Sequence, residues 1–129
     1  FLLNLSGAPQ PSRKKLLNKL ENGVNVVAED YTGTGIAWGM GAGVDENFLK
    51  DINSHLLKEN LAFLFDGERF KNAAESNHKH ETADDKLIKK VRQAHLKLAK
   101  KFNWIKINAN STIEEIHKKL WNKARKIIN

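Results

Sequence analysis

The sequence predicts one α/β domain, spanning residues 1–129, in which helices flank a parallel β-sheet on both faces to give three layers. Short apolar runs alternate along the chain with amphipathic helical patterns, and this alternation is typical of βαβ units. The run LAFLF at 61–65 is apolar on both sides, as expected for a parallel strand covered on both faces. A chain of 129 residues is long enough to bury a core of its own.

The amino-terminal part predicts a helix and then a strand. Leucines at helical spacing indicate a helix over 12–22, after a loop at 6–11 whose two prolines disfavour regular helix. The apolar run at 24–28 predicts a short buried strand. A glycine-rich bend follows the strand and extends to Gly43.

The next elements complete the first predicted βαβ unit. Apolar residues at helical spacing indicate a helix over 45–58, with Asp45 as its amino-terminal cap. The strand at 61–65 comes directly after it. A crossover of this length joins parallel strands, so we expect the strands at 24–28 and 61–65 to belong to one unit.

The middle of the chain predicts a short helix at 68–75, an exposed mobile loop at 75–85 and a long amphipathic helix at 86–102. The loop, ESNHKHETADD, is polar and lacks apolar periodicity. The core face of the long helix is expected to comprise Leu87, Ile88, Val91, Ala94, His95, Leu98 and Phe102.

A last strand and a last helix close the chain. The run WIKI predicts a strand at 104–107, and Ser111 with Glu114 has the spacing of a capping box that opens the final helix. Its core face is expected to comprise Ile113, Ile116, Leu120, Ala124 and Ile127.

Composition limits the function classes. The chain has no cysteine, which excludes disulfides and thiolate metal sites and favours a reducing cytoplasm. No apolar run approaches the roughly 20 residues that span a bilayer, and FLLNLSGAPQ lacks a basic leader. We therefore expect a cytoplasmic protein without a membrane partner. Because residue 1 is not Met, we also expect an amino-terminally truncated domain.

The net charge of +7 is unevenly distributed. Residues 24–85 carry five Lys or Arg against twelve Asp or Glu, whereas residues 86–129 carry thirteen against two, a balance of +11. This basic third is either a solvated face of two helices or a surface that attracts phosphates of a nucleotide or nucleic acid.

The carboxyl end of the strand at 24–28 is the first candidate site, because ligands bind at that edge of an open α/β sheet. Glu29 and Asp30 can orient a ligand hydroxyl or bind Mg²⁺ through water, or can simply meet solvent. Adjacent strand residues point to opposite faces, so at most one of the two enters a given site. Tyr31, Thr34 and Trp38 can line a nucleoside pocket or pack in the core.

The histidines give no strong sign of a metal site. His78 and His80 flank Lys79 in the polar loop, but no second ligand set occurs elsewhere in the chain. We expect a solvated loop or a phosphate-contacting lid there, and no metal ligands. We expect His55, His95 and His117, which lie on or beside apolar helix faces, to be partly buried structural residues.

The chain has three informative strings, at residues 29–38, 62–74 and 104–121. Together they resemble the thymidylate kinase family, nucleoside monophosphate kinases with the fold of the phosphate-loop NTPases. Residues 29–38, EDYTGTGIAW, keep the spacing of a family string that runs Asp-Arg-Tyr, two residues, Ser-Gly, a small apolar residue, Ala and an aromatic residue. Residues 62–74 are similar to the family's strand that ends in Asp before the lid. Residues 104–121 are similar to its last strand, adenine-side loop and final helix, with Asn108 where Asp is usual.

The resemblance implies a reaction and a set of residues. The family transfers the γ-phosphoryl group of Mg–ATP to dTMP or another deoxynucleoside monophosphate, so these nucleotides are the expected partners, and a homodimer is a further candidate. By position, Glu29 and Lys79 would be catalytic. Residues that would bind the monophosphate are Asp30, Tyr31, Thr34 and Trp38, and those that would contact ATP are Asn108, Ala109 and Asn110.

The chain departs from the family at its cationic positions. It contains no GxxxxGK[ST] string, which in this fold binds phosphates and Mg²⁺, so the first strand and phosphate loop are expected to be missing. The family's phosphate-orienting Arg falls on Asp30, a second Arg falls near Pro9, and the lid offers Lys79 in place of Arg. An Arg aimed at the transferring phosphoryl group is worth roughly a thousandfold in rate. We therefore expect impaired catalysis by this chain alone.

Two alternatives stay open from the sequence. One is a non-catalytic module with the kinase fold that uses its basic carboxyl-terminal third to bind a partner, with nucleic acid as the weaker candidate. The other, suggested by Glu29, is a relative of deoxynucleoside kinases that phosphorylates a nucleoside in place of its monophosphate.

Overall fold

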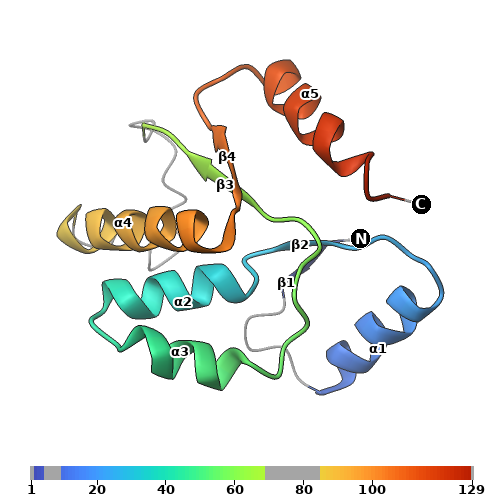
Figure 1. Ribbon diagram of the computed structural model, residues 1–129, viewed down its shortest axis with the longest axis horizontal. Coiled ribbons are helices and arrows are strands. Elements are labelled where there is room, and N and C mark those ends of the chain that lie inside the picture. Colours follow the sequence, from blue (N-terminus) through green and yellow to red (C-terminus); the bar gives the residue numbers. More distant parts are fainter. Residues whose placement is uncertain (1, 5–9, 69–84, 129) are drawn as a thin grey trace.

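The structure is a computed structural model that describes residues 2–4, 10–68 and 85–128 (Figure 1). The predicted helix at 68–75 and loop at 75–85 lie almost entirely outside the described residues. The described elements are β1 (Leu2–Asn4), α1 (Gln10–Glu21), β2 (Val27–Glu29), α2 (Thr32–Gly41), α3 (Glu46–Asn53), β3 (Phe63–Asp66), α4 (Asp85–Phe102), β4 (Ile105–Asn108) and α5 (Ile113–Ala124).

The strands pair in parallel, as predicted, but in a different order. β1 pairs with β2, and β3 pairs with β4, with Asp66 opposite Asn108 at the carboxyl end. Each pair is joined by a helix, which gives β1–α1–β2 and β3–α4–β4 units. The predicted unit of strands 24–28 and 61–65 is wrong, because β2 and β3 lie in separate two-stranded sheets of the described chain. Crossover length shows that strands can be parallel, but it does not decide which strands become neighbours.

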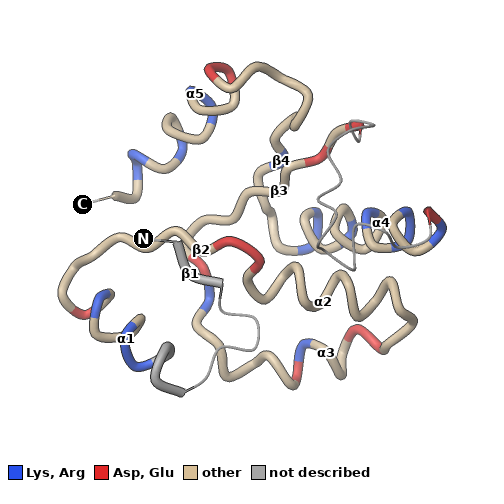
Figure 2. The backbone as a smooth tube through the Cα atoms, turned by 180° about the vertical axis from the view of Figure 1, so that it is seen from behind, with Lys and Arg blue, Asp and Glu red and all other residues tan. Residues whose placement is uncertain are grey.

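The core of the described chain lies between three helices. In Figure 1, α2 runs between α3 and α4, and it carries no charged residue, as the tan tube of Figure 2 shows. The helices bury a cluster of small and branched apolar side chains against which Met40 and Trp104 pack. The cluster comprises Ile36, Ala37, Leu49, Ala94 and Leu98.

The glycine-rich bend after residue 28 was predicted wrongly, because residues 32–41 form the helix α2. Glycine disfavours a helix by roughly 1 kcal/mol per residue, yet here it permits close packing. A Cβ at Gly39 would lie 2.7 Å from the Leu49 side chain, and one at Gly41 would lie 3.2 Å from the Val91 backbone. Tertiary contact with α3 and α4 therefore overrides the local preference.

The predicted strand at 24–28 is also displaced and is not buried. β2 begins at Val27, which is 64% exposed, and all three of its residues are exposed. The prediction that this strand is buried rested only on its hydrophobic residues. Burial also needs covering layers, and in the described chain β2 pairs with β1 alone.

Two helices have different ends from those predicted. α1 begins at Gln10 and includes Pro11, because the first turn of a helix has no partner for the N–H that proline lacks. α3 has the predicted Asp45 cap, whose Oδ1 accepts a hydrogen bond from Phe48 N at 2.9 Å. It ends at Asn53, five residues early, where the Ser54 hydroxyl donates to the Asp51 carbonyl at 2.7 Å.

The carboxyl-terminal elements are confirmed in order and differ in detail. α4 starts one residue before the predicted position, and β4 is shifted by one residue. The capping box of α5 uses Thr112 and Glu115, not Ser111 and Glu114. The predicted core face of α5 is wrong for the described chain, because α5 buries no residue and Ile113 is 80% exposed.

Candidate functional site

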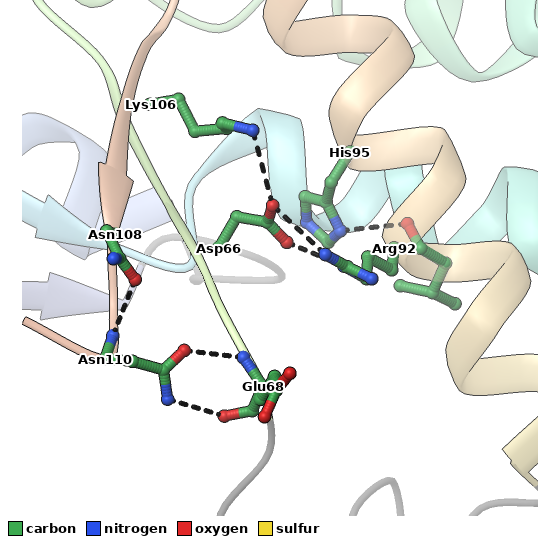
Figure 3. A network of polar contacts seen from close by, with 8 residues as sticks. Asp66, Glu68, Arg92, His95, Lys106, Asn108 and Asn110 are labelled. Atoms are coloured by element: carbon green, nitrogen blue, oxygen red, sulfur yellow. Dashed lines mark hydrogen bonds and ion pairs between the residues drawn. The ribbon is translucent and has the colours of Figure 1, made fainter.

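The carboxyl ends of three strands supply the polar groups of the candidate site. β2 is followed by Asp30, β3 ends in Asp66, and β4 ends in Asn108. Because β3 and β4 are parallel and in register, Asp66 and Asn108 lie side by side at one edge (Figure 3). The segments that follow both strands leave the sheet at this edge.

Asp66 is the centre of an ion-pair network. Arg92 of α4 donates to both of its carboxylate oxygens, from Nε to Oδ1 at 2.7 Å and from Nη2 to Oδ2 at 3.3 Å. Lys106 of β4 lies 3.6 Å from Oδ2. The Asp66 side chain is only 10% exposed, and hydrogen bonding to Arg92 lowers its pKa below the usual range, although burial opposes this shift. Asp66 is therefore held as a carboxylate that joins β3, β4 and α4.

The turn after β4 is fastened to the turn after β3. Asn110 Oδ1 accepts from Glu68 N at 2.6 Å, and its Nδ2 donates to Glu68 O at 3.0 Å. Asn108 Oδ1 accepts from Asn110 N at 3.0 Å, and Ala109 N donates to Asp66 O at 3.0 Å. These bonds, visible in part in Figure 3, fix the shape of the turn at 108–110 and use both asparagine side chains internally.

A cavity of about 280 Å³ opens beside this network, between α2, β3 and α4. Its apolar wall includes Trp38 of α2, and its polar groups are Asp66, Arg92 and His95. The volume is near the lower limit of roughly 300 Å³ for small-molecule sites, and an apolar wall with few polar groups is typical of such sites.

His95 contributes a partly buried imidazole to this cavity, as predicted. The same prediction was wrong for His55 and His117, which are exposed. Its Nδ1 lies 3.1 Å from the Val91 carbonyl oxygen, one turn earlier in α4. Burial lowers the pKa of His95 below 6.5, while the hydrogen bond to Val91 and the negative charge of Asp30 oppose this shift. Burial therefore favours the uncharged form of the ring.

Asp30 lies in an unusual backbone conformation. Its φ of 50° falls in the left-handed region, which is uncommon for residues other than glycine and is best tolerated by Asn and Asp. This conformation turns the chain from β2 into α2 and keeps the carboxylate close enough to act on the charge of His95.

The predicted site residues separate into two groups in the structure. Trp38 lines the cavity, and Asp30 acts electrostatically on His95. The Tyr31 hydroxyl instead donates a hydrogen bond to the Leu57 carbonyl at 2.8 Å. Thr34 is a half-buried residue in the first turn of α2. Glu29 is exposed on β2, opposite Asn4. The predicted catalytic Lys79 lies outside the described residues.

Sequence reasoning gave no site role to the three polar residues of the cavity, Asp66, Arg92 and His95. Arg92 is the one arginine in a helix whose other cations are lysines, and it lies three residues before His95, on the same side of the helix. That spacing next to an apolar face was the available signal. It was not used, because a basic helix face is usually solvated.

Part of the basic carboxyl-terminal third is neutralised by acidic residues of earlier elements. Lys50, Lys97 and Lys101 lie 2.5, 2.7 and 2.8 Å from the carboxylate oxygens of Glu46. Hydrogen bonds from these lysines lower the pKa of Glu46 well below its ordinary value of 4.5. α4 is therefore not simply a solvated basic face, since Glu46 ties it to α3.

The described residues contain neither a membrane-spanning helix nor a cluster of metal-binding side chains. In the segments 10–68 and 85–128, no helix is long and apolar enough to cross a membrane. The same part of the chain contains no group of three or more His, Cys, Asp or Glu side chains that could hold a metal ion. A cytoplasmic location and a homodimer stay predictions.

Comparison with known proteins identifies relatives of the chain. The family model of thymidylate kinase matches residues 6–120. A probable thymidylate kinase of Methanocaldococcus jannaschii is 33% identical over 119 residues, which cover 90% of this chain and 62% of the relative. The probable thymidylate kinase of Sulfolobus acidocaldarius is 29% identical and that of Thermococcus gammatolerans 33%. Their matches cover 81% and 77% of this chain, and 56% and 50% of the relatives. The chain thus spans 50–62% of the length of these proteins.

Proposed function

Because the chain belongs to the thymidylate kinase family, we propose that it takes part in the ATP-dependent phosphorylation of a deoxynucleoside monophosphate, with dTMP as the first candidate. The observation that carries this proposal is the family match over residues 6–120. Membership implies the phosphate-loop kinase fold, and the parallel strands joined by helices are compatible with it. The chain spans only part of its relatives, so the complete reaction is proposed and not assigned.

We propose the cavity beside Trp38 as the acceptor site. The indole ring gives a base an aromatic surface on which to pack. Arg92 has five N–H donors, and its bonds to Asp66 engage Nε and Nη2. Further guanidinium donors can bind a phosphate through charge-assisted hydrogen bonds. Asp66 would hold this cation in position.

The donor side of the site is proposed at the turn 108–110. Asn108 and Asn110 already bond within the protein, so Ala109 and the turn backbone are left to pack against the adenine of ATP. Mg²⁺ is commonly held by one or two carboxylates together with substrate phosphates. We therefore propose that it arrives with ATP, with Glu29 as the predicted catalytic carboxylate and Lys79 as the predicted catalytic cation.

We further propose that the 129-residue chain alone binds nucleotides but transfers phosphate slowly. Catalysis of phosphoryl transfer depends almost entirely on positioned positive charge. The chain lacks a GxxxxGK[ST] string and has Asp30 where the resemblance calls for Arg. A carboxylate at that place repels phosphate.

The proposal is tested by titrating the chain with dTMP, thymidine and ATP, and by a coupled assay of ADP release. We expect dTMP to bind, and Trp38→Ala to weaken that binding at least tenfold by removing the aromatic wall. Trp121→Ala is the matched control, because Trp121 is half exposed on α5. Equal binding by both variants would contradict the acceptor site. Robust turnover would contradict the impairment, and phosphorylation of thymidine would favour a nucleoside kinase.

One observation favours a second candidate, a nucleic-acid-binding module. The cations of α5 and of the turn after it are all exposed, and they recur along this part of the chain (Figure 2). We call these residues the basic stripe. This stripe comprises Lys118, Lys119, Lys123, Arg125 and Lys126. Binding of single-stranded DNA that weakens steeply with salt would support this role, whereas tight binding of mononucleotides alone would oppose it.

A further inference from the structure

His95, one of the residues that line the cavity, has a defined hydrogen-bonding pattern. The contact between Nδ1 and the Val91 carbonyl is a hydrogen bond only if Nδ1 carries the proton, because a carbonyl oxygen can only accept. In a neutral imidazole the other nitrogen is then an acceptor. Nε2, at the far side of the ring from this bond, makes no hydrogen bond within the part of the chain that the structure describes.

The charge of Asp30 favours a protonated ring, but burial is the larger effect and favours the uncharged form. Asp30 acts on it from the end of β2, while Asp66 of β3 is paired with Arg92 of α4 and with Lys106 of β4. α2, on the remaining side, carries no charged residue. Because both oxygens of Asp66 are engaged by Arg92, Nε2 is the uncharged side-chain acceptor among the described residues that line the cavity.

An uncharged acceptor beside an aromatic wall distinguishes between pyrimidine bases. Thymine and uracil carry a proton on ring nitrogen N3, whereas cytosine has a lone pair there. A thymine or uracil base packed on Trp38 with its edge toward His95 would donate a hydrogen bond from N3 to the imidazole. With cytosine, N3 of the base and Nε2 of His95 would be two acceptors facing each other. An unpaired acceptor in a partly buried site weakens binding.

We propose that His95 is a specificity-determining residue of the cavity and that its Nε2 accepts the N3–H of a thymine or uracil base. This inference rests on the proposed function, since it assumes that a pyrimidine monophosphate occupies the cavity. It assigns base selection to α4, whereas the resemblance placed the substrate-binding residues at 30–38.

The test compares affinities for dTMP, dUMP and dCMP by calorimetry at pH 8. The wild-type chain should prefer dTMP and dUMP to dCMP by roughly tenfold or more, the value of one hydrogen bond in a partly buried site. In His95→Asn the amide can occupy the place of Nδ1 and keep the bond to Val91, but it lacks an acceptor at Nε2. The preference should therefore fall to within about threefold, while dCMP affinity stays nearly unchanged.

His117→Asn is the matched control, because His117 is exposed on α5 and should keep the wild-type preference. Nitrogen NMR of the imidazole gives a second readout, in which Nε2 should be unprotonated in the free chain and shift when dTMP binds. Equal affinities of the wild-type chain for dTMP and dCMP would overturn the role of His95 and leave the proposed function standing. A proton on Nε2 would likewise overturn only the role of His95. Failure to bind any of the three nucleotides would overturn both that role and the proposed function.

Discussion

Thr112 is the amino-terminal cap of α5. Its side-chain oxygen accepts from Glu115 N at 3.2 Å, and a Glu115 carboxylate oxygen accepts from Thr112 N at 3.2 Å. Ser111 and Glu114 have the same spacing one residue earlier, so the sequence contains two equivalent capping boxes. The backbone decides between them, since Thr112 is extended, with φ −65° and ψ 158°.

Alanine substitutions should therefore show which residue, Thr112 or Ser111, caps α5. Thr112→Ala leaves N–H groups of the first turn without their acceptor and should destabilise α5 by about 1 kcal/mol, whereas Ser111→Ala should change little. Hydrogen exchange at Glu115 N and helical circular dichroism would measure both. A larger effect from Ser111→Ala would show that the helix begins one residue earlier in solution.

The contact between α2 and α4 depends on the absence of side chains at one position. Gly41 is buried where Val91 crosses it, and a Cβ there would contact the Val91 side chain and lie 3.2 Å from its Cα and N atoms. A backbone cannot yield as a flexible side chain does. Gly35, on the same helix, has open space around the same position.

These two glycines give opposite predictions at the level of the helix pair. Gly41→Ala should destabilise the chain by about 1–3 kcal/mol through overpacking. Gly35→Ala should stabilise it by up to about 1 kcal/mol, because alanine favours the helix. Urea denaturation of both variants would measure the free energies of unfolding. If both variants were stabilised, α2 and α4 would not pack as described.

At the scale of the whole molecule, two carboxylates tie separate elements together. Glu46 joins α3 to α4 through Lys97 and Lys101, and Asp66 joins β3 to α4 and β4. Both have pKa values lowered by hydrogen bonds from these cations. A group whose pKa is lower in the folded state stabilises that state above its unfolded pKa. This contribution is lost as pH falls through the folded value.

Stability should consequently fall as the solution is acidified below the ordinary pKa values of 4.5 for Glu46 and 3.8 for Asp66. Glu46→Gln removes one titrating group, so its unfolding free energy should be lower at pH 7 and should decline less between pH 5 and pH 3. Asp51→Asn, an exposed change on the same helix, is the control. In high salt the difference at pH 7 should shrink. Parallel declines in both variants would contradict the role of Glu46.

Much of the element order could be predicted because hydrophobic periodicity is local. α4 differs from its predicted bounds by one residue, and the strands at 63–66 and 105–108 follow their predicted apolar runs within two. Elements were predicted wrongly where the hydrophobic pattern was weak or where contacts with distant segments determine the structure. β1 was missed, and α2 was hidden by glycines whose packing reason lies on α3 and α4.

The candidate site likewise combines residues that the local sequence indicates with residues whose role depends on the fold. Asp30 and Trp38 could be singled out because they follow a strand end, a position that itself indicates a ligand edge. Arg92 and His95 were not singled out, because their spacing alone is a weak signal and their importance comes from a cavity formed by elements about 30 to 60 residues apart in the chain. A side chain's role in such a site depends on what the fold places opposite it.

By itself, the sequence determined an α/β chain with parallel strands and its resemblance to thymidylate kinases, since local pattern and ordered strings carry both. Only the tertiary structure decided which strands pair, that glycine-rich residues form a helix, and that Asp66, Arg92 and His95 meet beside Trp38. The physical reason is that pairing, close packing and ion pairs are contacts between distant segments. Their free energy is set by neighbours that local patterns do not specify.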